Sequence, residues 1–190
     1  MQIRFLIILS TFIFFTGCST MSLQEKEKAR SSIETMAEKT LKEAIAKRPI
    51  IQERLDNALG YAVGNIKVTK VPVVGAGGGN GLFVDLKDDE RRYLKITRID
   101  IGGGWGAKSY KVIVIINSEK IMDEFRSGVW NFEAGAEMAA GTVGAEGSSS
   151  NLIDRGFRLY RVLDGGASAT VTARLIRVKI DQELTLTEIQ

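Results

Sequence analysis

The sequence changes character at Asn65. From this residue onward, β-branched and aromatic residues alternate with polar ones, and glycines interrupt the pattern at short intervals. Alternation with a period of two places successive side chains on opposite faces of a strand. We therefore predict strands at residues 67–74, 82–86, 92–101, 111–116, 130–136, 158–163 and 169–180.

Two polar segments separate strand-like runs and predict hairpin turns. They are the sequences DDE at residues 88–90 and DGG at residues 164–166. Helices do not alternate regularly with the strands, as they would in a parallel βαβ arrangement. The expected fold class is α+β: N-terminal helices followed by a mainly antiparallel, β-rich single domain with one inserted short helix.

A segment rich in Glu, Lys and Ala precedes the strands, at residues 23–47. Its apolar face lacks Trp and Phe, and its polar face is as acidic as it is basic, so packing against the domain is favoured over lying on a membrane surface. Pro49 ends this helix and begins a second helical pattern that continues to Ala62. The apolar residues of the first helix recur every three or four positions, at Ala29, Ile33, Met36, Ala37, Leu41, Ala44 and Ile45.

The inserted helix is expected between Ser118 and Gly128. Ser118 is a good N-cap residue, and glycine suits the C-terminal end of a helix. Ile121, Met122 and Phe125 form the apolar stripe of this segment.

The N-terminus has the features of a secretory signal. Arg4 supplies a positive charge, and residues 5–15 form an apolar stretch that spans roughly 16 Å as a helix, far short of the ~30 Å hydrocarbon core of a bilayer. The sequence FTGC at residues 15–18 resembles the bacterial lipobox, although Phe15 stands where that motif usually has Leu. We expect a lipoprotein signal peptide at residues 1–17 and a lipidated tether at residues 18–22. The alternative is an ordinary signal peptide followed by an incidental cysteine.

Cys18 is the single cysteine of the sequence, so no disulfide can form within the chain. A lone thiol in an exported protein fits lipidation, for example with palmitate, and several acyl chains attach a protein firmly to a membrane. Ser19 is not the Asp that commonly retains lipoproteins at the inner membrane. The expected location is therefore the cell envelope, with the chain anchored to the outer membrane and facing the periplasm.

The composition argues against most enzyme chemistry and against nucleic-acid binding. The formal net charge is only +3, and the chain contains no histidine. We therefore expect no enzyme activity, no catalytic residues, no cofactor, no metal site and no nucleic-acid partner. Carboxylates could still support a hydrolase, and Glu133, Glu137 and Glu146 lie close together in sequence, although solvated charges are the simpler interpretation.

Two glycine clusters resemble nucleotide-binding loops without meeting their requirements. The sequence GAGGGNG at residues 75–81 lacks the Lys-Ser or Lys-Thr of a phosphate loop. The sequence GGGWGA at residues 102–107 fits a dinucleotide fingerprint formally, but a strand is expected after it instead of a helix. The favoured interpretation is that these glycines let crowded strands or loops approach closely.

The order of these motifs resembles the SYLF domain, the lipid-binding module of a yeast actin-regulator family that also occurs in bacterial lipoproteins. The recognisable core covers about residues 58–145, within a single SYLF-like domain at residues 23–190. Asn80 stands where many members have an aromatic residue, and Gly103 replaces bulkier residues. The matching features are ALGYAV at 58–63, KVPVVGAGGGNG at 70–81, IDIGGGWGA at 99–107, the strand at 112–116, the helix ending near Phe125, and WNF at 130–132.

The resemblance implies binding, not catalysis. Eukaryotic members bind acidic phosphoinositides, and some bind actin filaments. For an envelope lipoprotein it implies binding of anionic lipid head groups, or of a peptidoglycan-linked anionic polymer, through a basic surface. The candidate lipid-binding residues are Lys67, Lys70, Arg91, Arg92, Lys95, Arg98, Lys108 and Lys111.

Other interpretations remain open at this stage. The basic residues could be scattered solubilising charges, or the chain could be a structural or assembly factor that binds another envelope protein. An exposed apolar patch would favour such a protein partner. A second basic series lies on the presumed last hairpin: Arg155, Arg158, Arg161, Arg174, Arg177 and Lys179.

Overall fold

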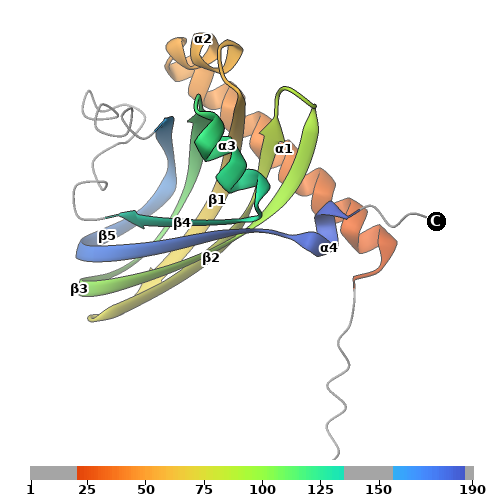
Figure 1. Ribbon diagram of the computed structural model, residues 1–190. Helices are drawn as coiled ribbons and strands as arrows, with labels where there is room; N and C mark the ends of the chain where they lie inside the picture. The colour runs from red at the N-terminus through yellow and green to blue at the C-terminus, as the bar shows by residue number, and fades with distance from the viewer. Residues whose placement is uncertain (1–20, 135–155, 187–190) are drawn as a thin grey trace, which may run out of the picture.

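A computed structural model describes residues 21–134 and 156–186 of the chain, and it has the α+β fold that the sequence predicts (Figure 1). The long N-terminal helix is followed by mainly antiparallel strands with a short helix inserted among them. The elements are α1 (Leu23–Lys47), α2 (Ile50–Asp56), β1 (Gly60–Lys70), β2 (Val74–Asp85), β3 (Glu90–Ile116), α3 (Glu119–Arg126), β4 (Val129–Ala134), β5 (Phe157–Ile180) and α4 (Gln182–Thr185).

The five described strands form one sheet, in the order β1-β2-β3-β5-β4, with an additional pairing between β1 and β3. Strand β3 pairs with β2 over residues 90–101 and with β1 over residues 106–116. Strand β5 pairs antiparallel with β3 from Leu94 to Ile116 of β3. Because β3 borders the β1–β2 hairpin on both sides, the sheet curves back on itself and has an inner and an outer face (Figure 1).

Glycines make the bend in β3 possible. Gly102, Gly104 and Gly106 have φ angles of 135°, 123° and 142°, in a region that residues with a side chain rarely adopt. They lie where β3 changes its partner from β2 to β1. The second glycine cluster is therefore the corner of a strand and not the start of a phosphate-binding helix.

The inner face is packed with aromatic and aliphatic side chains and is covered by α3. Phe125 of α3 stacks on Phe83 at 5.1 Å between ring centroids and lies 4.5 Å from Trp130. Ile121 and Met122 are buried in the same cluster. The three apolar residues that predicted an amphipathic helix therefore close one end of the inner face.

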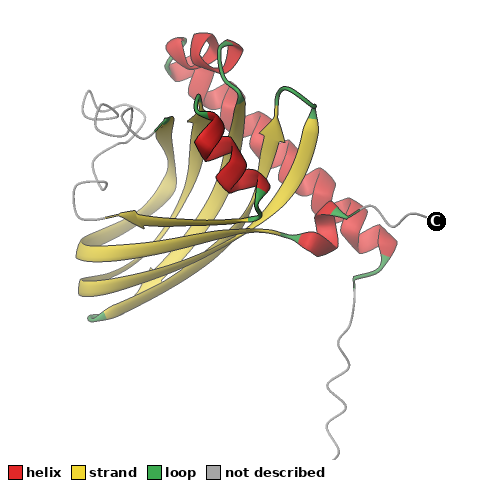
Figure 2. Cartoon of the chain, viewed as in Figure 1, coloured by secondary structure: helices red, strands yellow, loops and turns green. Residues whose placement is uncertain are grey.

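The outer face is covered by α1, α2 and α4 over only part of its area. Figure 2 shows the long helix α1 and the short helix α3 on opposite sides of the sheet. Ile33, Ala37 and Ala44 of α1 are buried against Val63 and Ile113 of the sheet. The predicted packing of the first helix on the domain is confirmed, with the same bounds. Within the described residues, no helix combines the length and the apolar character that crossing a membrane requires.

Tyr93 fastens α1 to the sheet. Its hydroxyl donates a hydrogen bond of 2.8 Å to Glu34, and its backbone N–H donates one of 3.0 Å to Thr185. Burial and this acceptor carboxylate raise the pKa of Tyr93 to about 12. At the start of α1, Ser22 and Glu25 form a reciprocal capping box.

Two predicted boundaries were wrong near the N-terminus of the sheet. The second helix ends at Asp56, and β1 begins at Gly60 instead of after Asn65. A Cβ atom at Gly60 would lie 2.7 Å from the carbonyl oxygen of Val84, so the backbones meet too closely for another residue. The predicted strand at residues 67–74 is interrupted by a turn at residues 71–73 between β1 and β2.

The predicted hairpin at residues 164–166 is also wrong. Strand β5 is continuous from Phe157 to Ile180, and residues 92–101 and 111–116 likewise belong to one strand. The polar DGG segment is accommodated by a bulge, because Ser109 pairs with Gly165 and Tyr110 pairs with Leu163. In contrast, the hairpin predicted at residues 88–90 is confirmed, with Asp89 at a φ of 51°.

Candidate functional site

The eight basic residues predicted to bind lipid do not form one surface. Lys70 and Arg98 lie inside, with exposed fractions of 5% and 2%. Lys67 and Lys95 are exposed, whereas Lys108 and Lys111 are half-buried. Arg91 lies 3.6 Å from Glu34, and Arg92 is bound to Glu90 at 2.7 Å.

Arg98 belongs to a buried polar cluster on the inner face. Its Nε donates a hydrogen bond of 2.6 Å to one carboxylate oxygen of Asp100, and its Nη2 donates one of 2.6 Å to the other. Its Nη1 donates to the hydroxyl of Tyr110. Burial alone would lower the pKa of Arg98, but these bonds raise it, so the group stays charged. The guanidinium of Arg161, from β5, lies 5.3 Å from the centroid of the Tyr110 ring.

Lys70 lies beside this cluster. Gly75 pairs with Lys70 on one side and with Asp100 on the other. A Cβ atom at Gly75 would lie 3.2 Å from side-chain atoms of both residues, so the glycine lets them come together. Within the described chain, the buried ammonium group of Lys70 has no hydrogen-bond partner.

A cavity of about 70 Å³ adjoins the cluster. Most of its wall is apolar and includes Ile96, Val112, Trp130 and Ile176. The polar side chains of its wall are Arg98, Tyr110 and Arg161. The inner face thus combines an apolar cavity with a polar end formed by Arg98, Tyr110 and Arg161.

The outer face carries a second group of cations, beyond the region that α1 covers. Lys67, Lys95, Arg177 and Lys179, here termed the basic belt, are all exposed. The strand register places Lys95 directly opposite Lys179. The same register places Lys67 in one row with Arg177, through Gly78 and Thr97.

Exposed apolar side chains follow the basic belt toward the far end of the sheet. The next row pairs Ile99 with Leu175, and the row after it pairs Ile101 with Val74. The backbone N–H of Gly102 donates a hydrogen bond of 2.9 Å to the carbonyl of Val73, which joins the β1–β2 turn to the bend of β3. We term the exposed residues at this end the apolar tip: Val71, Val73, Val74, Ile99, Ile101, Trp105 and Leu175.

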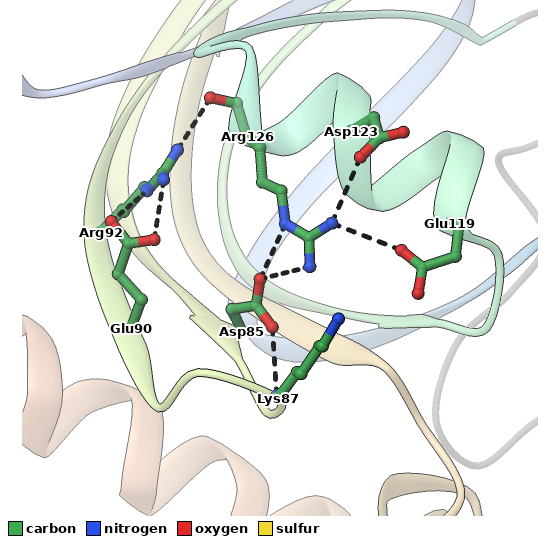
Figure 3. Close-up of polar contacts among 7 residues, drawn as sticks. All are labelled: Asp85, Lys87, Glu90, Arg92, Glu119, Asp123 and Arg126. Carbon is green, nitrogen blue, oxygen red and sulfur yellow. Dashed lines mark hydrogen bonds and ion pairs between the residues drawn. The ribbon is translucent and has the colours of Figure 1, made fainter.

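Carboxylates gather at the opposite end of the sheet, where those of Asp85, Glu90, Glu119 and Asp123 each bind an arginine (Figure 3). Arg126 of α3 contacts Asp85 at 2.7 Å, Asp123 at 3.2 Å and Glu119 at 3.3 Å. Burial would raise the pKa of Asp85, but hydrogen bonds from Arg126 and from the backbone of Lys87 lower it below its ordinary value. These groups are neutralised structural partners, a poor arrangement for acid–base catalysis.

Several sequence predictions fall outside the described side chains. These are Cys18, Glu133, Glu137, Glu146, Arg155 and Arg174. In the portion that the structure describes, no three His, Cys, Asp or Glu residues are grouped so that they could hold a metal ion.

Sequence reasoning missed the division of the basic residues between the two faces. The signal was present in β3, where Leu94, Ile96, Arg98 and Asp100 share one face with a period of two. The odd-numbered residues that alternate with them, Lys95 to Ile101, form the outer face. The apolar tip was missed because Trp105 was considered only as part of a glycine motif.

Comparisons with known proteins give little guidance. No protein-family model matches the sequence. One relative, Beta cell expansion factor A of Aeromonas veronii, is 24% identical over 161 residues, which cover 85% of this chain and 60% of the relative. The chain therefore spans less than two thirds of that protein, and its function has to be argued from its own geometry.

Proposed function

We propose that this chain is a non-enzymatic lipoprotein of the cell envelope that docks on anionic lipid through the basic belt and the apolar tip. The observation that carries the proposal is their arrangement on one face of one sheet. Two rows of cations are followed directly by two rows of exposed aliphatic residues. An anionic bilayer presents the complementary order, with phosphates outside and hydrocarbon within.

The dimensions fit this interpretation. From Thr97 to Ile101 the strand advances by about 13 Å, since a strand rises about 3.3 Å per residue. The apolar tip can therefore enter the interface while the basic belt stays at the level of the phosphates. Each Lys or Arg near an anionic surface contributes about 1 kcal/mol. Trp105, with 72% of its surface exposed, is the residue type that prefers the membrane interface.

The register of the basic belt also supports an anionic partner. Lys95 and Lys179 lie directly opposite each other in neighbouring strands. Like charges in this position destabilise a sheet. The next outward-facing row toward the tip contains Thr97 and Arg177, neither of which is acidic. Phosphate groups of a lipid surface would offset it.

The resemblance to the SYLF domain and the expected anchor at Cys18 agree with this proposal. An anchored domain is confined to the membrane surface, where even weak affinity is sufficient. The lipid anchor at Cys18 and the docking surface of basic belt and apolar tip would then act together.

A second candidate function is binding to another envelope protein, and the exposed apolar tip favours it. A protein partner of the tip would not require the basic belt. The role of the belt therefore separates the two candidates.

The test compares vesicle binding of two charge-reversed variants. The chain without its anchor is expected to bind vesicles containing phosphatidylglycerol more strongly than pure phosphatidylcholine vesicles, and binding is expected to weaken with salt. Substituting Lys95, Arg177 and Lys179 together by Glu is expected to abolish the difference between the two lipids. The matched control substitutes Lys28, Lys42 and Lys120 by Glu, because these lysines are exposed on α1 and α3, away from the belt.

Two outcomes would reject the proposal. One is equal binding to both kinds of vesicle at low salt. The other is an equal loss of binding in the belt variant and the control variant, which would reflect net charge alone. Binding must be measured with an assay that detects millimolar affinity, such as vesicle co-sedimentation at high lipid concentration.

A further inference from the structure

The bend of β3 determines where part of the apolar tip lies. It covers residues 102–106, between the part of β3 that pairs with β2 and the part that pairs with β1. Three of its glycines have φ angles from 123° to 142°, and glycine adopts such angles and many others with little steric restriction. Ile101 precedes the bend and Trp105 lies within it, and both are exposed. Their positions therefore depend on what fixes a segment of low intrinsic rigidity.

Backbone pairing with β5 holds one edge of the bend. On the inner face, β2 contributes no side chain beside Arg98, because Gly77 is the residue of β2 that pairs with it. A Cβ atom at Gly77 would lie 2.6 Å from the carbonyl oxygen of Lys67, so no larger residue fits there. Contacts between the two parts of β3 at this level therefore come from side chains of β3 itself.

One polar contact joins the two parts of β3 across the inner face. Arg98 lies before the bend and Tyr110 lies after it. The Nη1 atom of Arg98 donates a hydrogen bond to the hydroxyl of Tyr110, and the guanidinium carbon lies 5.5 Å from the centroid of the tyrosine ring. The contact thus connects the segment that enters the bend with the segment that leaves it.

Both partners of this contact are held in place. Arg98 and Tyr110 have exposed fractions of 2% and 3%, so bulk water does not compete for their hydrogen bond. The two carboxylate oxygens of Asp100 accept from the Nε and Nη2 atoms of Arg98, which fixes the plane of the guanidinium. A hydrogen bond from a charged donor is stronger than a neutral one, and a low-dielectric interior strengthens it further. The contact is therefore suited to hold the bend in one conformation.

We propose that Arg98 and Tyr110 are positioning residues for membrane docking: their contact fixes the bend of β3, so that Ile101 and Trp105 are in place before the apolar tip enters the lipid. The inference rests on the function proposed above. A bend that lacks the contact is less ordered in solution and has to be ordered on binding, which costs affinity. The basic belt lies on the outer face and keeps its cations with or without the contact.

The chain offers a matched contact away from the bend. Arg54 of α2 donates a hydrogen bond from Nη1 to the hydroxyl of Tyr160, and its guanidinium carbon lies 5.7 Å from the centroid of that ring. Tyr160 is as deeply buried as Tyr110, with an exposed fraction of 2%. Tyr110→Phe and Tyr160→Phe therefore delete the same kind of hydrogen bond and keep both rings, but only the first change touches the bend.

A spin label in the bend tests whether the contact fixes it. A Cβ atom at Gly103 would meet no described atom within 4 Å, and the φ angle of Gly103 lies outside the positive range of its neighbours, so a labelled Gly103→Cys side chain fits there. Residues 19–190 contain all the described elements and lack Cys18, the single cysteine, so the introduced thiol is unique. The mobility of the label is measured by electron paramagnetic resonance in solution.

The two tyrosine variants are expected to differ in this measurement. Tyr110→Phe is expected to increase the mobility of the label at position 103. Tyr160→Phe is expected to leave it unchanged. A label at Lys120→Cys on α3, an exposed position away from the bend, should respond to neither substitution.

Vesicle binding tests whether the fixed bend serves docking. Tyr110→Phe is expected to bind phosphatidylglycerol vesicles about fivefold more weakly than the unmodified chain, since the bend has to be ordered on binding. The steepness of the salt dependence is expected to stay the same, because the basic belt is intact. Tyr160→Phe is expected to bind like the unmodified chain. Urea unfolding establishes that both variants are folded and are destabilised to a similar extent.

Three results would overturn the inference. One is a label at position 103 that is equally mobile in the unmodified chain and in a folded Tyr110→Phe chain, because the bend would then be fixed without the contact. Another is unchanged vesicle binding in a Tyr110→Phe chain whose bend is mobile. The third is an equal loss of binding in Tyr110→Phe and Tyr160→Phe, which would reflect lower stability alone.

Failure of the proposed docking itself gives a different result. Equal binding of the unmodified chain to phosphatidylglycerol and phosphatidylcholine vesicles rejects docking on anionic lipid, and the positioning role with it. The spin label at position 103 is measured without vesicles, so it still shows whether the contact of Arg98 with Tyr110 fixes the bend.

Discussion

The two ends of the same sheet differ in which side chains they bury and which they expose. At the end covered by α1 and α3, apolar side chains are buried and the carboxylate of Asp85 is paired with Arg126. At the other end, Lys70 and Arg98 are buried while Ile101 and Trp105 are exposed. The covered end follows what stability requires. The tip end departs from that rule, and the proposed docking on anionic lipid would account for its exposed apolar residues.

Glycine accounts for how one chain can form both ends. The inward-facing positions of β2 are Gly75, Gly77, Gly79 and Gly81 before the buried Phe83. A Cβ atom at Gly79 would lie 1.7 Å from the carbonyl oxygen of Asn65, so β1 and β2 approach closely there. The glycines thus leave little side-chain volume in the tip half, whereas Phe83 fills the covered half.

Truncating one apolar residue in each half gives the largest expected contrast. Phe83→Ala removes a ring that stacks on Phe125, and it is expected to lower the free energy of unfolding by about 3–5 kcal/mol. Ile101→Ala at the apolar tip is expected to change it by less than about 0.5 kcal/mol, because 64% of this side chain is exposed. Urea denaturation measures both. Similar losses in the two variants would show that the tip contributes to stability after all.

The ion pair at the covered end is expected to have the next largest effect. Asp85→Asn leaves Arg126 without its buried carboxylate and is expected to cost about 2 kcal/mol at pH 7. Because the folded pKa of Asp85 is lowered, its contribution is full above its unfolded pKa of about 3.9 and is lost as the pH falls through the folded value. The difference between wild type and variant should therefore shrink in acid. A difference that is constant from pH 7 to pH 3 would contradict the assignment.

Tyr93 provides a smaller effect with the opposite pH dependence. Removing its hydroxyl in Tyr93→Phe deletes the bond to Glu34 and is expected to cost about 1 kcal/mol. The folded pKa of about 12 is above the ordinary value of 10.0, so this stability is present below pH 10 and is lost as the pH rises toward 12. Ultraviolet titration of tyrosinate should show a tyrosine that ionises near pH 12 in the wild type and is missing in the variant. A normal titration in both proteins would mean that α1 is not held in this way.

Much of the fold could be predicted from local patterns. The bounds of α1 follow from the period of its apolar residues and from Pro49, which ends the helical pattern. The β2–β3 turn follows from its polar residues. The continuity of β3 and β5 could not be predicted, because Gly102 and Gly165 are turn residues locally and become strand residues only when a long partner pairs with them.

The candidate site was less predictable than the fold. Charge alone placed Lys70 and Arg98 on the surface, although the alternation around Arg98 indicates the inner face. The cavity depends on Arg161 and Tyr110, which the register brings together from two different strands. Sequence distance gives no indication of that contact.

The smallest predicted change in the free energy of unfolding concerns Lys95 of the basic belt. Lys95→Gln removes the repulsion with Lys179 directly opposite, so it is expected to raise the free energy of unfolding by about 0.2–0.5 kcal/mol. The same substitution is expected to weaken binding to phosphatidylglycerol vesicles by about fivefold, since one cation near an anionic surface contributes about 1 kcal/mol. Stability and binding thus move in opposite directions, which is expected only if the like-charged pair exists for a ligand. Lys120→Gln on α3 is the matched control and should change neither quantity. A Lys95→Gln protein that is less stable, or that binds the vesicles unchanged, would mean that these lysines only keep the outer face soluble.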